Sequence, residues 1–191
     1  MLTEKIMYVD TEATALHNGA IIQLSGIIEI NGEVKKEFNF FVKPHKGASI
    51  QQEALKITNS TEKQIFGYPD PREVKDYFES MMSEFVDKYD REDKFILVGY
   101  NTNFDLNMLI DFYKQQGDTT LSYWFDYRHT IDIHELLKLL QFKNRIPIFK
   151  NNKLGNVCKE LNILENTNKL HDSLEDVRVT REVAKKLLKL F

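Results

Sequence analysis

Three apolar runs near the N-terminus, two of them joined by a tight turn, constrain the fold of this chain most. Residues 5–10, 20–30 and 34–42 are predicted strands, and the second and third are connected through Asn31-Gly32. Asn-Gly between apolar runs favours a two-residue hairpin turn, because both residues tolerate positive φ angles. The chain is therefore predicted to begin as a three-stranded antiparallel meander.

Helical patterns begin after Pro44. Residues 61–64 have the spacing of a capping box, and Asp70-Pro71 is predicted to begin a helix that continues to about Tyr89. Residues 95–100 form a buried-strand candidate with a helix predicted over 103–116, and this order indicates a parallel addition to the sheet. Later elements are predicted as a short strand over 128–132 and helices over 133–140, 153–161 and 173–190. The expected class is α/β, with a mixed sheet flanked by helices.

Length and composition indicate an ordinary globular protein. With 191 residues, 42% of them hydrophobic and 29% charged, the chain can build one sizeable core, so a single domain over residues 1–191 is expected. The lone Cys158 excludes an intramolecular disulfide. No apolar run approaches the roughly 18 residues needed to cross a bilayer, and residues 1–12 resemble the start of a strand. We therefore expect a cytoplasmic protein with no membrane partner.

The net charge of −3 does not decide whether the partner is a nucleic acid. A protein that coats a duplex needs a long basic face, which this balance does not predict. A protein that binds one strand end needs only a local positive site. The partner class therefore depends on the chemistry of individual residues.

Asp10 and Glu12 lie two residues apart where the first apolar run ends. Side chains two apart on a strand point to the same face, so both carboxylates can coordinate one hard cation. Asp105 follows a predicted strand and Asp176 lies early in the last predicted helix. Strand ends and helix starts meet at the same edge of α/β sheets, so four carboxylates can converge there. Such a set would repel strongly without cations, and oxygen ligands suit Mg²⁺ or Mn²⁺.

Hydrolysis of a phosphodiester is a reaction that such a site can perform. Two ions about 4 Å apart activate a water on one side of the phosphate and stabilise the leaving oxygen on the other. The water must lose a proton near neutral pH, and His171, five residues before Asp176, titrates in that range.

The segments Asp10–Glu12, Asn101–Asp105 and His171–Asp176 resemble, in order and separation, the three motifs of the DEDDh branch of the DnaQ-like 3′–5′ exonucleases. Proofreading exonucleases of the DNA polymerase III epsilon type are members of that family. The resemblance covers nearly the whole chain, including Asp132, which lies where the family often has an Asp before a helix. It implies a ribonuclease H-like fold, in agreement with the predicted meander and parallel strands.

The resemblance also implies roles for individual residues. Two divalent ions, Mg²⁺ or Mn²⁺, would be held by Asp10, Glu12, Asp105 and Asp176. His171 would be the general base. The residues expected around the terminal nucleotide are Thr11, Ala13, Asn101 and Phe104. The reaction would release 5′-mononucleotides from a free 3′ end.

Two differences from the family pattern concern the surroundings of the terminal nucleotide. Family members commonly carry Asp-x-Glu-Thr-Thr-Gly, whereas residues 10–15 read Asp-Thr-Glu-Ala-Thr-Ala, without the glycine. A His-Asn pair often precedes the second motif, where this chain has Tyr100-Asn101. Neither difference removes a predicted ligand or the histidine.

Three functions remain open from the sequence. The leading hypothesis is a 3′–5′ exonuclease acting on single-stranded DNA ends, with a polymerase or repair protein as a candidate partner. The nearest alternative is an exoribonuclease that trims RNA ends, because the choice depends on contacts to the 2′ position. A catalytically silent binding subunit of a polymerase assembly is the third, although it would be expected to have lost a ligand or the histidine.

Overall fold

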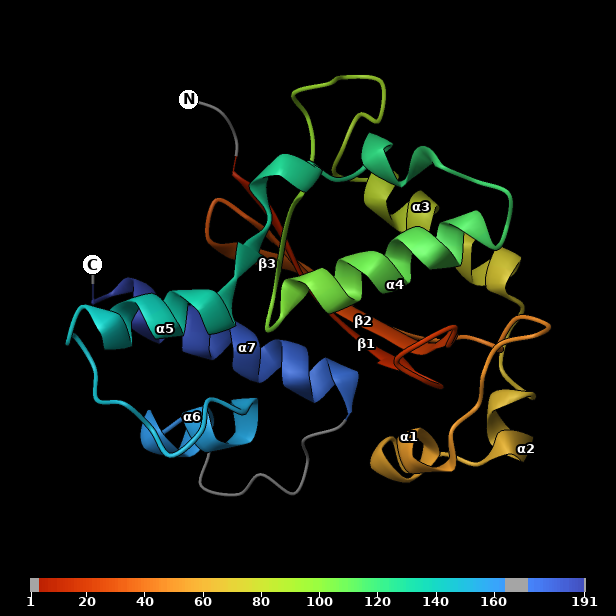
Figure 1. The fold of residues 1–191 in the computed structure, drawn as a ribbon. Helices are drawn as coiled ribbons and strands as arrows, with labels where there is room; N and C mark the ends of the chain where they lie inside the picture. Colours follow the sequence, from red (N-terminus) through yellow and green to blue (C-terminus); the bar gives the residue numbers. More distant parts are fainter. Residues whose placement is uncertain (1–3, 164–171, 191) are drawn as a thin grey trace.

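A five-stranded mixed sheet forms the centre of the molecule (Figure 1). The computed structural model describes residues 4–163 and 172–190. The order across the sheet is β3-β2-β1-β4-β5. The strands are β1 (Lys5–Ala13), β2 (Ile21–Ile30), β3 (Glu33–Phe41), β4 (Ile96–Gly99) and β5 (Ile131–Asp132).

The predicted antiparallel meander is confirmed. β1 pairs with β2, and β2 with β3, in antiparallel register. The turn between β2 and β3 has φ angles of 49° at Asn31 and 81° at Gly32, as a two-residue hairpin turn requires. β1 is longer than expected and continues to Ala13, so Asp10 and Glu12 lie within the strand.

The later strands extend the sheet in parallel, as predicted. β4 pairs with β1 from Ile6↔Ile96 to Tyr8↔Val98, and β5 pairs with β4 at Val98↔Ile131 and Gly99↔Asp132. The mixed sheet flanked by helices confirms the expected α/β, ribonuclease H-like class.

The helices follow the predicted order, with two differences. The helix that begins at Asp70-Pro71 ends at Ser83, before the expected Tyr89, because Val86 packs into the core from a non-helical segment. The helix over Gln52–Ile57 is absent from the sequence predictions, because it is short, lacks a side-chain cap and buries only Leu55. The α-helices are α1 (Gln52–Ile57), α2 (Glu62–Ile65), α3 (Pro71–Ser83), α4 (Thr102–Lys114), α5 (Ile133–Phe142), α6 (Leu154–Glu160) and α7 (Ser173–Leu188).

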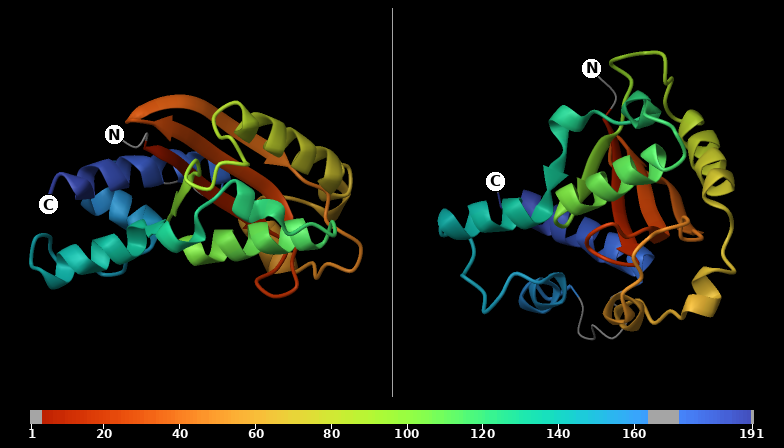
Figure 2. Two further views of the ribbon diagram at one scale, coloured as in Figure 1. Left: turned by 90° about the horizontal axis from the view of Figure 1, so that it is seen from above. Right: turned by 45° about the vertical axis from the view of Figure 1, so that its right-hand side comes forward.

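Alternate residues of β1 pack on opposite faces of the sheet. Met7 and Val9 belong to the cluster that includes α3 and α4 side chains. Ile6 and Tyr8 belong to the cluster formed with α5, α6 and α7. Figure 1 shows α5–α7 on the left and α3 and α4 on the right, and Figure 2 shows the same arrangement from two further directions. Within the described residues, no helix is long and apolar enough to cross a membrane.

Candidate active site

Three carboxylates from two elements converge at the end of the sheet. Asp10 and Glu12 lie on the α7 side of β1, and Asp176 lies in the first turn of α7. Each of the three offers an oxygen atom, and these atoms all lie within 4.8 Å of one another. The structure thus brings residues 10 and 176 together across most of the length of the chain.

A buried polar network fixes the start of α7 against β2. Asp172 is the N-cap, and its carboxylate accepts two backbone N–H bonds from the first turn. The hydroxyl oxygens of Ser173 and Ser25 lie 2.6 Å apart, and Gln23 Nε2 donates to Asp172 Oδ2 at 3.4 Å. Ser25 is opposite Asp10 in the sheet register. This anchoring places the first turn of α7, which carries Asp176, beside the strand carboxylates.

Asp105 is held on the other face of β1. Its side chain is 3% exposed, and Oδ1 accepts hydrogen bonds from the Thr11 backbone N–H and hydroxyl, both at 2.8 Å. Asp105 is not a member of the 4.8 Å group of carboxylates found in the described residues. Its charge nevertheless acts on Asp10 and Glu12, as their pKa values show.

The first turn of α4 is held by a carboxylate from the neighbouring strand. Asn101, the N-cap, has a φ of 70° and makes no side-chain capping bond. Asp132 instead accepts the N–H groups of Asn101 at 3.0 Å and Thr102 at 3.1 Å, and also that of His134 at 2.9 Å. One carboxylate therefore orients the starts of both α4 and α5.

Burial and mutual repulsion raise the pKa values of the clustered acids. Burial raises the pKa of Asp10 well above its ordinary range, and the charges of Asp105, Asp176 and Glu12 raise it further. Burial, with the charges of Asp176 and Asp105, raises the pKa of Glu12 to about 8. Burial raises the pKa of Asp105 to about 7, although the bonds from Thr11 oppose the shift. A bound cation would offset this repulsion, so the donor set fits a divalent metal ion.

We expect the stabilising effect of Mg²⁺ to increase with pH. The unfolded chain loses these protons near the ordinary values of 4.5 for Glu12 and 3.8 for Asp105, whereas the metal-free fold keeps them to about 8 and 7. The free energy of unfolding of the metal-free protein therefore decreases as the pH rises from the ordinary to the raised pKa values, because the folded state binds more protons than the unfolded state over that range. Saturating Mg²⁺ should raise the melting temperature more at pH 8 than at pH 6.

Thermal unfolding with KCl at matched ionic strength is the control, because it separates metal binding from screening. Glu12→Gln should weaken the pH dependence of the Mg²⁺ effect, since it removes one of the titrating groups. An equal shift in melting temperature at both pH values would contradict the expectation.

The residues predicted around the terminal nucleotide differ in exposure and in their contacts. Thr11 is buried, and its N–H and hydroxyl are both directed to Asp105. Ala13 and Phe104 are partly buried against the α4-side cluster, and Asn101 is exposed. His171, the predicted general base, lies outside the described residues.

The sequence predictions gave no role in the site to Ser25, Ser173 or Asp172. The sequence does contain one signal for Ser25: Gln23 and Ser25 are two polar residues with period-two spacing in the mostly apolar β2. That pattern indicates one polar patch on a buried strand. Its partner on α7 is a tertiary contact that the sequence does not specify.

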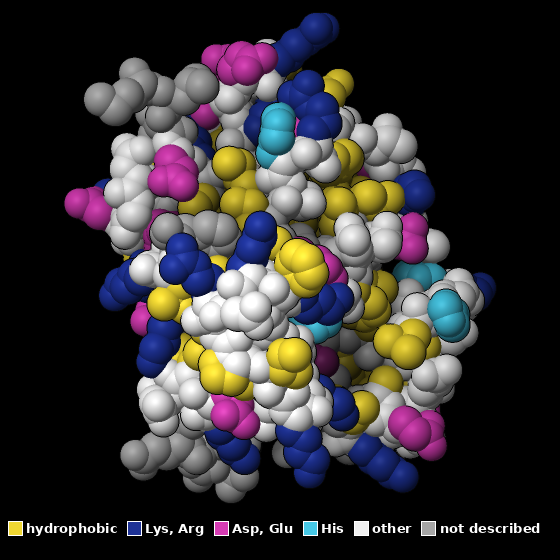
Figure 3. Space-filling view, turned by 60° about the vertical axis from the view of Figure 1, so that its left-hand side comes forward, with side chains coloured by type: hydrophobic (Ala, Val, Ile, Leu, Met, Phe, Trp, Pro, Cys, Tyr) yellow, Lys and Arg dark blue, Asp and Glu magenta, His cyan; other side chains and the backbone are white. Residues whose placement is uncertain are grey.

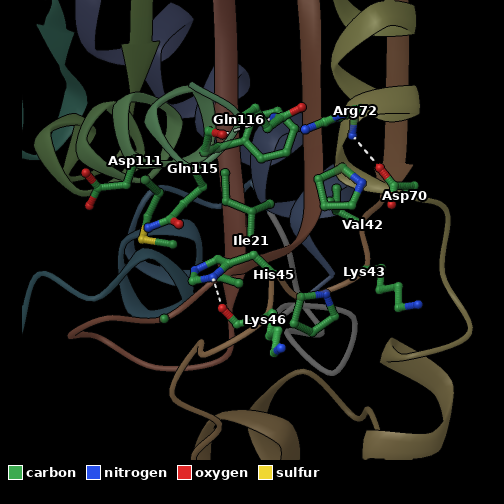
Figure 4. Close-up of a pocket in the computed structure, with 16 residues that line it drawn as sticks. Ile21, Val42, Lys43, His45, Lys46, Asp70, Arg72, Asp111, Gln115 and Gln116 are labelled. Atoms are coloured by element: carbon green, nitrogen blue, oxygen red, sulfur yellow. Dashed lines mark hydrogen bonds between the residues drawn. The ribbon is translucent and has the colours of Figure 1, made fainter. Parts of the chain in front are cut away.

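A separate cavity of about 280 Å³ lies on the α4 side (Figure 4). Ile21 contributes from β2 and Arg72 from α3, while Val42 follows β3 and Gln115 follows α4. None of the predicted metal ligands lines this cavity. The candidate metal site and this cavity are therefore separate.

The order and placement of these motifs agree with a known family. The exonuclease family model RNase_T matches residues 7–184. The chain belongs to the RNase_T exonuclease family. The predicted resemblance to DnaQ-like exonucleases is thereby confirmed, and the matched residues span all three motifs.

The chain is similar in sequence to DNA polymerases and in structure to exonuclease I. It is 28% identical over 182 residues to a DNA polymerase III PolC-type of Listeria innocua serovar 6a, covering 94% of this chain and 11% of the relative. The chain thus spans about a tenth of the length of the curated relatives it matches. Escherichia coli exonuclease I in complex with a dA16 oligonucleotide superposes with a TM-score of 0.78 at 19% identity, over 97% of this chain and 41% of that one. A zinc ion-bound exonuclease I–ssDNA complex superposes with a TM-score of 0.77 at 18% identity, over 97% and 40%.

Proposed function

We propose that this chain is a metal-dependent 3′–5′ exonuclease that releases 5′-mononucleotides from single-stranded DNA ends, with residues 1–191 forming one exonuclease domain. The convergence of Asp10, Glu12 and Asp176 within 4.8 Å is the observation that carries the proposal. Membership of the exonuclease family supports the reaction class.

Four carboxylates would hold two divalent ions, Mg²⁺ or Mn²⁺: Asp10, Glu12, Asp105 and Asp176. When bound, such a pair would supply Lewis acidity to the scissile phosphate and compensate the charge on the leaving oxygen. The protein's own contribution is to hold the ligands in place before substrate arrives. Thr11 fixes the Asp105 carboxylate, and the contact between Ser25 and Ser173 fixes the start of α7.

His171 would act as the general base. A neutral imidazole nitrogen would accept a proton from the hydrolytic water as that water attacks phosphorus, and the proton would then pass to solvent. The ordinary pKa of about 6.5 for histidine keeps the imidazole mostly neutral at physiological pH. His171 directly precedes Asp172, the N-cap of α7, and this helix carries Asp176.

Single-stranded DNA is the substrate that the relatives favour. The curated relatives are named as DNA polymerases, and the exonuclease I structures contain a DNA oligonucleotide. The polymerase relatives also suggest a polymerase as partner. RNA remains the alternative substrate, because the distinction depends on contacts around the 2′ position.

Digestion of matched DNA and RNA 12-mers with 5′ labels tests the proposal. With Mg²⁺, the DNA ladder should shorten from the 3′ end and release mononucleotides, while RNA is degraded more slowly. Release from RNA alone would replace DNA with RNA as the substrate. Binding of both oligomers without release from either, in the presence of Mg²⁺ or Mn²⁺, would favour a silent binding subunit.

A further inference from the structure

One segment is strongly basic although the chain as a whole is acidic. Residues 136–159 contain six Lys or Arg residues and no Asp or Glu, whereas the net charge of the chain is −3. Four of the cations lie between α5 and α6, in residues 143–153, which we call the basic loop. All four are exposed and have no ion-pair partner within residues 4–163 and 172–190: Lys143, Arg145, Lys150 and Lys153.

The basic loop has a fixed conformation. Gln141, which is buried, donates from Nε2 to the Pro147 carbonyl at 3.2 Å and accepts from Asn152 Nδ2 at 2.9 Å. Ile146 and Phe149 pack against the α5–α7 cluster. The apolar residues of the loop therefore face inward, and the cations are left on the surface.

A hydrogen bond joins the loop to Tyr100, which lies just before α4. The Tyr100 hydroxyl donates a hydrogen bond to the Asn152 carbonyl, and the Tyr100 ring lies 5.2 Å from the His134 ring between centroids. Tyr100 precedes Asn101, which begins the helix that carries Asp105. The loop is therefore attached beside the start of α4, the helix that carries the proposed ligand Asp105.

Two large apolar side chains are exposed among these cations. Phe142 is 79% exposed and Ile148 is 84% exposed. Figure 3 shows exposed apolar side chains beside Lys and Arg side chains on the side of the molecule where α5 and α6 lie. Cations next to apolar and aromatic side chains match the alternating phosphates and bases of a single strand.

We propose that the basic loop binds the single-stranded polynucleotide on the 5′ side of the terminal nucleotide, an inference that rests on the proposed exonuclease function. Lys143, Arg145 and Lys150 contact backbone phosphates, and Phe142 and Ile148 contact bases. The loop thereby contributes to the binding of long substrates, while the carboxylate group acts on the terminal nucleotide. Short oligonucleotides do not use the loop, because they lack the phosphates that it would contact.

Charge reversal in the loop tests this assignment. In the triple variant Lys143→Glu, Arg145→Glu and Lys150→Glu, the affinity for fluorescein-labelled dT20, measured by anisotropy in EDTA, should fall by at least about tenfold. The slope of log affinity against log salt should decrease by about 2, because each lost phosphate contact removes roughly 0.7 for single strands. Hydrolysis of a trinucleotide with Mg²⁺ should remain within about twofold of wild type.

A control with the same change in charge reverses three exposed cations elsewhere: Lys35→Glu, Arg91→Glu and Lys114→Glu. It should bind dT20 more tightly than the loop variant and with a steeper salt slope. Equal affinity and equal salt slope in the two variants would overturn the proposal. The basic loop would then be a candidate binding surface for a protein partner. The trinucleotide assay tests the nuclease function separately, because the dT20 measurement requires no turnover.

Discussion

Asp10→Asn should abolish nucleotide release. Asp10 offers an oxygen within 4.8 Å of those of both Glu12 and Asp176, so its loss leaves two of the three carboxylates of this group. Loss of a metal ligand removes several kcal/mol of transition-state stabilisation, which corresponds to a decrease of about 10³-fold or more in kcat/KM. Single-turnover digestion of a labelled DNA oligomer measures the loss.

The same variant should stabilise the metal-free protein. Burial raises the pKa of Asp10, and the charges of Asp105 and Asp176 raise it further, so its ionised form is unfavourable in the metal-free fold. Asn has a similar shape and no charge, so the melting temperature in EDTA should rise at pH 8, while the increase caused by Mg²⁺ should shrink. Asp76→Asn makes the same chemical change on the exposed surface of α3 and should alter neither quantity. Wild-type turnover in Asp10→Asn would refute the proposed ligand set.

His171→Ala should lower kcat by about 10²-fold to 10⁴-fold, the range typical of a positioned general base. The proposed metal ligands are carboxylates, so the Mg²⁺ effect on the melting temperature should be retained. Wild-type kcat should fall as the pH decreases through the pKa of the imidazole, because the protonated ring cannot accept a proton. The variant should lose that inflection and show a rate that rises with hydroxide concentration.

His129→Ala is the matched control for the histidine prediction. His129 is exposed and hydrogen-bonded to Asp126, away from the carboxylate group, so its loss should leave the pH profile unchanged. A His171→Ala variant with wild-type kinetics across neutral pH would show that another group accepts the proton.

The sheet could be predicted from the sequence because its signals are local. Asn31-Gly32 specifies the hairpin turn through backbone preference, and the apolar runs on either side specify the strands. The end of α3 could not be predicted in the same way. Val86 continues the apolar pattern beyond Ser83, but it packs into the core from irregular backbone, and only the tertiary structure distinguishes the two cases.

The carboxylates of the candidate site could be identified from residue type and spacing, whereas the residues that hold them could not. Asp10 and Glu12 share a strand face, and period-two spacing is enough to predict that. The bonds from Thr11 to Asp105 join residues 94 positions apart, and Ser25 and Ser173 are 148 positions apart. Such contacts depend on how the helices pack on the sheet, and threonine and serine in strands or helix starts have many other uses.

The candidate site can form only when β1 pairs with its neighbouring strands in the correct register. Thr11 faces α4 and holds Asp105, while its neighbours Asp10 and Glu12 face α7. A slip of one residue in strand pairing would exchange the two faces, turning the carboxylates away from Asp176 and the threonine away from Asp105. If the proposed function holds, a misregistered chain would be unable to cut nucleic acid, and hydrolytic competence would arise only after the sheet has been correctly assembled.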